Sequence, residues 1–315
     1  MNEAMPPKRL APVLTDVLVH PQTKKKLTWQ PDGLIAEDGT VFPIVRGIPR
    51  FVGSDAYVNS FSFEWNTHNR TQLDSFTGSE ASEAFFAEKT TLTPDDVRGR
   101  LVLDAGIGAG RFSDVLSRWG ANVVGVDLSY AVEASHANFL DRENVLVAQA
   151  DIGQLPFAPG TFDLIVSIGV LHHTPDTEKY FKALVPLLKE GGRICIWVYP
   201  KIGDYITRNE WIPYTSRIPS KMFYDWCRWF VPLAERHRDR RWVQMARKLF
   251  PFSDQGLGLE NDILDTFDGY SPTFHGIHTP EEVVRWFNEA GLSEVRALPY
   301  LTAVTGVRPP ALRAM

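Results

Sequence analysis

The chain has 315 residues, of which 44% are hydrophobic and 23% charged, and its formal net charge at pH 7 is −5. Two cysteines are too few for a disulfide framework or a multi-cysteine metal site, and the negative charge argues against nucleic-acid binding by the molecule as a whole. No apolar run reaches the roughly 20 residues that a membrane span needs. The N-terminus lacks the apolar core of a signal peptide, so we expect a cytoplasmic protein.

Residues 1–53 are predicted to form a separate β-rich unit. Its strand-like segments are short and separated by Pro-Asp-Gly and Asp-Gly turns: 27–29, 34–36 and 41–44. The stretch GTVFPIVRGIP, residues 39–49, resembles the second half of small zinc-ribbon-like proteins. In the first half, His20 and Thr23 stand where that pattern has cysteines, and one histidine cannot complete a four-ligand zinc site. The resemblance therefore implies the fold without the metal.

Residues 54–98 are predicted to be a helical connector that caps a ligand. The segment FEWNTHNRTQL combines aromatic rings with an arginine and an amide. An aromatic face attracts a cation, and arginine can hold a carboxylate in a bidentate fork. We therefore interpret Trp65, Arg70 and Gln72 as candidate ligand contacts. A plain amphipathic connector is the alternative, and the pattern does not decide between the two.

A glycine-rich loop follows the first strand of the next region. The segment LVLDAGIGAGRF, residues 101–112, passes from an apolar strand through an acid and three alternating glycines into the start of a helix. In an open α/β sheet such a loop lies at the carboxyl ends of the strands, where ligands bind. A dinucleotide site needs glycine at position 111, which is arginine here. The candidates in this loop are Asp104, Gly106, Gly108 and Gly110.

Three more strands are predicted over residues 121–128, 145–150 and 161–170. Asp127 closes the first of them, and Asp151 follows the second. An acid about 20 residues beyond a glycine-rich loop is placed to accept hydrogen bonds from ribose hydroxyls. The third strand is preceded by Leu-Pro-Phe and followed by a pair of histidines.

These blocks, in this order over residues 101–173, resemble class I S-adenosylmethionine (SAM) dependent methyltransferases. The resemblance implies a Rossmann-like seven-stranded α/β sheet whose final strand is antiparallel, with SAM as the cofactor and residues 99–200 as the SAM-binding core. It also implies that Asp104 and the glycine loop face the methionine part of SAM. A nicotinamide site and an empty Rossmann-like sheet are the alternatives. The remaining contacts that the resemblance implies are Asp127 to the ribose, Leu128, Asp151 and Ile152 to the adenine, and Ile168 near the sulfonium.

The rest of the chain is predicted to add a lid and complete the sheet. A helix is expected over 176–188 and a strand over 193–199. Residues 201–278 are too long for an ordinary connection and are rich in tryptophan, and their length and position predict an inserted helical lid. The resemblance implies that this lid builds the acceptor pocket, and the alternative is that its tryptophans only fill the core of the lid. The basic run 235–248 could contact RNA or form the solvent-exposed face of a helix. Residues 279–315 then supply a capped helix and the last two strands.

Methyl transfer needs a base only where the acceptor carries a proton that must leave. His172 and His173 follow the fourth strand and are the first candidates. Tyr270 and His275 come from a second block, FDGYSPTFHGIH, that joins the lid to the core. Packing or orienting roles are the alternative for all four.

The acceptor that these patterns favour is a small or medium organic molecule, such as a natural product, a sugar or a lipid-linked intermediate, methylated on oxygen. An RNA methyltransferase for tRNA or rRNA, and a SAM-binding protein without transferase activity, are the alternatives. No pattern in the chain decides its oligomeric state, so a homodimer stays open.

Overall fold

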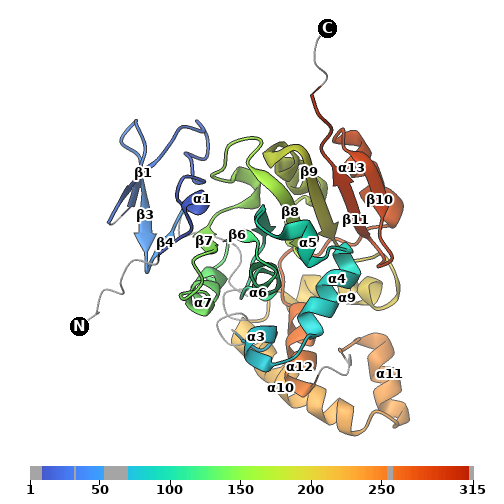
Figure 1. Cartoon of the computed structure of the whole chain (residues 1–315). Helices are drawn as coiled ribbons and strands as arrows, with labels where there is room; N and C mark the ends of the chain where they lie inside the picture. The colour runs from blue at the N-terminus through green and yellow to red at the C-terminus, as the bar shows by residue number, and fades with distance from the viewer. Residues whose placement is uncertain (1–8, 32, 53–69, 254–257, 312–315) are drawn as a thin grey trace, which may run out of the picture.

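The structure is a computed structural model that describes residues 9–31, 33–52, 70–253 and 258–311. A seven-stranded mixed sheet lies at its centre (Figure 1), with the strand order β10-β11-β9-β8-β5-β6-β7. The neighbours from β9 to β7 pair in parallel, whereas β11 is antiparallel to both β9 and β10. This confirms the predicted α/β class. The strands are β5 Leu101–Ala105, β6 Asn122–Asp127, β7 Val145–Gln149, β8 Phe162–Ile168, β9 Leu188–Trp197, β10 Ser293–Ala297 and β11 Ala303–Val307.

The parallel strands form because their residues are apolar on both faces. All five residues of β5 are buried, as are all five of β7. Helices cover both faces of such a sheet, so neither face can carry the polar residues of a half-exposed strand. The chain winds from β5 toward β7 and then returns to β8 on the other side of β5. This reversal opens a crevice at the carboxyl ends of β5 and β8.

The helices of this core are short: α6 Arg111–Arg118, α7 Ala131–Asn138, α8 Thr177–Leu184 and α13 Pro280–Glu289. The Asp176 side chain caps the N-terminus of α8. Single 3₁₀ turns lie between them: η1 Ile152–Gln154, η2 Leu171–His173 and η3 Val185–Leu187. Thr279 caps α13 with a full capping box, as predicted. The prediction of a helix to residue 188 and a strand from 193 is wrong. Pro186 has no amide hydrogen to donate, so α8 does not continue through it. The single turn η3 contains Pro186 and leads directly into β9.

The predicted connector and lid are helical where the structure describes them. The connector carries α3 Asp74–Thr77, α4 Ala81–Thr90 and α5 Pro94–Val97. The lid carries α9 Gly203–Thr215, α10 Ser220–Arg236, α11 Arg241–Leu249 and α12 Leu259–Asp268. Figure 1 shows α10, α11 and α12 in orange at one end of the molecule, away from the N-terminal sheet. The lid has its own core of Phe223, Cys227, Phe267 and Tyr270.

The N-terminal unit is a small antiparallel sheet preceded by one helical turn. Its elements are α1 Pro12–Thr15, β1 Thr28–Gln30, β2 Gly33–Ile35, β3 Val41–Val45 and β4 Ile48–Pro49. It lies against the β7 edge of the main sheet, where the Phe51 amide donates to the Gln149 carbonyl oxygen at 2.8 Å. Arg50 donates to the Gln149 side chain at 3.0 Å and pairs with Glu133 at 3.1 Å. These contacts fix the unit on the side of the sheet away from the lid.

His20 has a structural role in this unit. Its Nδ1 accepts hydrogen bonds from the backbone amides of Gln22 and Thr23, both at 3.1 Å. Within the described ranges, no group of three or more His, Cys, Asp or Glu side chains is placed to hold a metal ion. The zinc-ribbon resemblance of this unit stays a prediction. In the same part of the chain, no helix combines the length and apolarity that crossing a membrane requires.

Candidate functional site

A cavity of about 290 Å³ opens at the carboxyl edge of the main sheet, in the crevice between β5 and β8. Loops after β5, β6, β7 and β8 form one half, and the end of β9, the connector and the lid form the other. The polar side chains that line it are Gln72, Arg111, Asp127, Asp151, His173, Thr174, Tyr180, Tyr199, Tyr205, Arg208, Asp265, Asp268 and Tyr300. This is the place where open α/β sheets bind ligands.

The glycine-rich loop and Asp127 are joined by hydrogen bonds. The amide of Gly108 donates to Asp127 Oδ2 at 3.0 Å, and the amide and hydroxyl of Ser129 donate to Oδ1 at 2.8 and 2.7 Å. Gly106 has φ +94°, and a Cβ there would lie 2.3 Å from the Val170 side chain. Glycine is therefore required for the loop to pass this close to the strand end. Burial raises the pKa of Asp127, although its three hydrogen bonds oppose the rise.

Two predicted residues of this loop lie behind the cavity instead of lining it. Asp104 is buried and accepts a hydrogen bond from the Ser113 hydroxyl at 2.7 Å. Burial raises the pKa of Asp104 to about 6. Gly110 has φ +102°, and a Cβ there would lie 2.4 Å from the ring of Phe139. Both residues therefore shape the start of α6 from behind the cavity, without lining it.

The ends of β6, β7 and β8 supply the rest of this half. Leu128, Asp151, Ile152 and Ile168 all line the cavity, as do Gly106 and Gly108. Asp151 Oδ1 accepts from the Gly153 amide at 2.8 Å, which fixes the carboxylate at the start of η1. Three strand ends therefore bring two carboxylates and a glycine loop to one cavity, as the sequence pattern predicts for a nucleoside.

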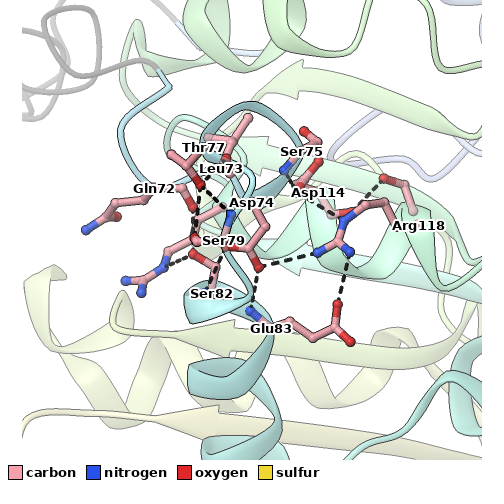
Figure 2. A network of polar contacts seen from close by, with 12 residues as sticks. Gln72, Leu73, Asp74, Ser75, Thr77, Ser79, Ser82, Glu83, Asp114 and Arg118 are labelled. Carbon is pink, nitrogen blue, oxygen red and sulfur yellow. Dashed lines mark hydrogen bonds and ion pairs between the residues drawn. The ribbon is translucent and has the colours of Figure 1, made fainter. Parts of the chain in front are cut away.

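The connector reaches the cavity through Gln72, Leu73 and Phe85. Figure 2 shows how Asp74 holds it: the carboxylate accepts from the amides of Ser82 and Glu83 at 3.0 and 2.9 Å, at the first turn of α4. The same carboxylate pairs with Arg118 of α6 at 3.4 Å. A capped α4 is thereby clamped to the helix that follows the glycine loop.

The other two connector candidates have different positions. Arg70 does not line the cavity. Its Nε donates to the Asn138 side chain at 3.3 Å, and its guanidinium lies 4.3 Å from the centre of the Phe76 ring. Trp65 lies outside the described residues. In this part of the cavity the lining guanidinium is that of Arg111, whose Nε donates to the Ser82 hydroxyl at 3.0 Å.

A second set of charged side chains lines the half formed by the lid. Arg208 comes from α9, Asp265 and Asp268 come from α12, and Tyr199 follows β9. The Tyr199 hydroxyl donates to Asp268 Oδ2 at 3.1 Å. Burial raises the pKa of Asp265 and of Asp268 to about 6, and the charge of Arg111 opposes the rise for Asp265. Sequence analysis missed this set.

The histidines lie where these two halves meet. His172 is fully buried, and its ring stacks on Tyr199 with 3.7 Å between centroids. His173 lines the cavity and donates from Nδ1 to the Phe274 carbonyl oxygen at 3.0 Å. Burial lowers the pKa of His173 to about 4 and of His275 to about 3, and lowers the pKa of His172 well below its ordinary value. All three rings are therefore neutral at pH 7.

Tyr270, the fourth catalytic candidate, does not line the cavity. It is fully buried in the core of the lid, where its hydroxyl donates to the Pro251 carbonyl oxygen at 2.7 Å. Its ring stacks on Phe250 with 4.0 Å between centroids. The residue therefore holds the lid segments together.

A buried lysine lies directly behind the aromatic wall of the cavity. Lys89 Nζ lies 3.2 Å from the centre of the Phe85 ring, 3.4 Å from Tyr300 and 4.8 Å from Trp197. Among the described residues it has no hydrogen-bond partner, and burial lowers the pKa of Lys89 to about 7. All three rings line the cavity. The spacing of Phe85 and Lys89, one helical turn apart, was the signal in the sequence that could have indicated this contact.

Part of the chain is similar to known proteins. Residues 103–196 match the family described as a methyltransferase domain. The chain is 32% identical over 117 residues to the demethylmenaquinone methyltransferase of Thermobifida fusca, a match that covers 36% of this chain and 50% of the relative. It is 34% identical over 107 residues to the ubiquinone biosynthesis O-methyltransferase of Albidiferax ferrireducens, with 33% and 41% covered.

The chain thus spans about half or less of the length of the curated relatives that it matches. Among solved structures, the magnesium protoporphyrin IX methyltransferase of Synechocystis, crystallised with bound SAH, has a TM-score of 0.41 and 16% identity, with 82% of this chain and 90% of that chain covered. The matched region contains β5 through most of β9, which carry the glycine loop and both strand-end acids.

Proposed function

From the premise that residues 103–196 form a methyltransferase domain, we propose that this protein transfers a methyl group from SAM to a hydroxyl of a small or medium organic acceptor. The observation that carries the proposal is a single cavity with two chemically different halves. One half has the glycine loop and strand-end acids that suit a nucleoside. The other, under the lid, has charged and aromatic side chains that suit a polar ring or head group.

The cofactor half fits SAM through its own residues. A Cβ at Gly106 would fill the space against Val170, so the loop backbone is open to a ligand only with glycine there. Asp127 would accept from the ribose hydroxyls, and Asp151 would accept from the adenine amino group. Arg111, with Gln72 beside it on the lining, would pair with the SAM carboxylate in place of Arg70. When bound, SAM supplies an electrophilic methyl group on a sulfonium, which suits the aromatic rings of the opposite wall.

The acceptor half contains a proton acceptor that suits an alcohol or phenol. The carboxylate of Asp268 lines the cavity, and the Tyr199 hydroxyl holds it at 3.1 Å. Burial raises the pKa of Asp268 to about 6, nearer to neutrality than the lowered pKa of His173. A base whose pKa is closer to the working pH removes a proton more effectively while remaining ionised. We therefore assign Asp268 the role of base and His173 a neutral, orienting role.

The names of the curated relatives support a small-molecule acceptor, because one refers to demethylmenaquinone and the other to O-methylation in ubiquinone biosynthesis. An RNA acceptor would use the basic run of the lid, and a protein that only binds SAM would lack the acceptor half of the cavity. A cytoplasmic location and a homodimer belong to the proposal as further expectations.

Two measurements test the proposal on the full chain. SAM and its demethylated product should each raise the melting temperature, because a ligand that binds only the folded state stabilises it. Tritium from methyl-labelled SAM should then enter the small-molecule fraction of a host extract, and its product should resist mild base if an ether has formed. Absence of any melting shift with both ligands would exclude the SAM site. Label that enters only the RNA fraction would favour the RNA alternative.

A further inference from the structure

The lid helix α11 exposes an apolar stripe. Trp242, Met245 and Leu249 recur at the spacing of one helical face, and they are 46%, 65% and 66% exposed. Val243 points the other way and is buried in a small core under the helix. The helix is thus already packed on one side, and the exposed stripe is additional apolar surface. Large exposed side chains in one stripe mark an interaction surface.

A tryptophan of a neighbouring helix extends this stripe. The Trp211 indole of α9 donates to the Leu249 carbonyl oxygen at 2.6 Å, and the Trp211 ring is 38% exposed. Figure 1 shows α11 at the lower right of the molecule, on the opposite side from the N-terminal sheet. We call the four side chains Trp211, Trp242, Met245 and Leu249 the lid stripe.

The charge around the lid stripe is opposite to that of the molecule. Residues 236–249, which form α11 and the segment directly before it, contain six Arg and Lys side chains and one Asp, in a chain whose net charge is −5. Arg241 and Lys248 lie on α11 itself and are exposed. A positive surface attracts an anionic partner even when the rest of the protein is acidic. The partner of this surface is therefore expected to be both apolar and negatively charged.

We propose that the lid stripe docks on the surface of an anionic phospholipid bilayer. Tryptophan rings suit the boundary between head groups and acyl chains, methionine and leucine suit the apolar layer below, and arginine and lysine pair with lipid phosphates. RNA would satisfy the positive charge but would leave Met245 and Leu249 without an apolar partner. The same lid supplies Arg208, Asp265 and Asp268 to the cavity, so docking would bring a lipid-borne acceptor close to the cavity.

Vesicle flotation tests this surface on the full chain without any need for SAM or an acceptor. The probe is a vesicle of phosphatidylcholine with one quarter phosphatidylglycerol, compared with phosphatidylcholine alone at 0.1 M salt. Binding to the anionic vesicles should exceed binding to the neutral ones at least tenfold, and salt should weaken it. Equal binding to both vesicles, or binding to neither, would overturn the proposal.

The decisive variant replaces three exposed residues, Trp242→Ser, Met245→Ser and Leu249→Ser. It should lose at least tenfold in vesicle binding while keeping the melting temperature shift with SAM. The matched control exchanges three exposed apolar residues of the N-terminal sheet, Ile35→Thr, Val41→Thr and Val45→Thr, and should bind vesicles like the natural chain. If the lid variant binds anionic vesicles as well as the natural chain does, the surface is not a lipid-docking face. If the lid variant loses tRNA binding instead and keeps vesicle binding, the surface belongs to RNA and the proposal fails.

That proposal stands apart from the methyl transfer proposed above. A protein that binds SAM but not anionic vesicles would retain the proposed function and lose the docking surface. A protein that binds the vesicles through the lid stripe without binding SAM would do the reverse.

Discussion

The two halves of the cavity are built in different ways. In the cofactor half, the glycine loop and both acids lie at the ends of buried parallel strands: Gly106 just after β5, Asp127 as the last residue of β6, and Asp151 just after β7. In the acceptor half, Arg208, Asp265 and Asp268 come from two helices of the lid. The first half is fixed by backbone hydrogen bonding between strands, and the second by the packing of side chains within the lid.

The largest effect should come from the acid that anchors the cofactor half. Asp127→Ala removes a carboxylate that accepts from Gly108 and Ser129 and that would accept from the ribose. Charge-assisted hydrogen bonds contribute about 1.5–3 kcal/mol each, so SAM should bind at least about 100-fold more weakly. Isothermal titration calorimetry gives the dissociation constant. The control is Asp141→Ala on the exposed surface, and equal affinities for the two variants would show that Asp127 does not contact SAM.

This difference explains what the sequence could and could not predict. Parallel strands bring their carboxyl ends to one edge, so an acid at a strand end can be assigned to the cavity from spacing alone. That rule places Asp127 and Asp151 at strand ends, and both line the cavity. The seven-stranded sheet followed from the resemblance to methyltransferases and not from this rule. The rule does not say which way a side chain near a strand end points. Asp104 precedes the loop by two residues, and its side chain accepts from Ser113 instead of lining the cavity.

The acceptor half could not be predicted in this way. Which face of α12 meets the cavity depends on how Phe223 and Phe267 pack inside the lid, and no short motif records that packing. The same limit applies to the arginines. An aromatic-rich segment favoured Arg70, but its guanidinium lies over Phe76, and Arg111 reaches the cavity instead.

The second effect tests the acceptor half. Asp268→Asn should reduce the rate of label transfer from SAM into a host extract about 100-fold, because a positioned base contributes roughly 10²–10⁴. Affinity for SAM should change less than threefold. The pKa of Asp268 is raised to about 6, so the natural protein should lose activity as the pH falls below 6 and the carboxylate becomes protonated. The variant should lack this loss of activity at low pH, which is the acid limb of the pH profile.

Tyr199→Phe serves as the companion variant for the base. It removes the hydroxyl that donates to Asp268, and a carboxylate that loses a hydrogen bond to its charged form has a higher pKa. The acid limb of the pH profile should therefore move upward. If both variants keep the natural profile, the limb belongs to another group and the assignment of Asp268 as base fails.

A third effect separates packing from binding within the glycine loop. Gly110→Ala places a Cβ 2.4 Å from the Phe139 ring at φ +102°, so backbone strain adds to overpacking. We expect a loss of about 2–4 kcal/mol in the free energy of unfolding by urea denaturation. Gly39→Ala has a similar φ of +84° but nothing within 4 Å, and it should cost only about 1 kcal/mol. Equal losses would mean that Phe139 moves aside freely.

The smallest effect concerns the buried lysine behind the aromatic wall. Burial lowers the pKa of Lys89 from 10.5 to about 7. At pH values between these two, Lys89 is therefore protonated in the unfolded chain but not in the folded chain. Stability should therefore rise with pH from about 7 to 10, and below pH 7 the cost of burying the ammonium is at its full value. Lys89→Met removes that cost but also the contacts with Phe85 and Tyr300, each of which stabilises a cation.

The net gain of Lys89→Met should then be about 1 kcal/mol at pH 6.5, and it should fall above pH 7 and change sign as the natural lysine loses its proton. Melting curves of both proteins across this range give the difference directly, so other titrating groups cancel. Lys89→Arg keeps a charge that does not titrate here, and its stability relative to the methionine variant should stay constant with pH. A methionine variant that is less stable at every pH would mean that the rings stabilise the ammonium by more than its burial costs.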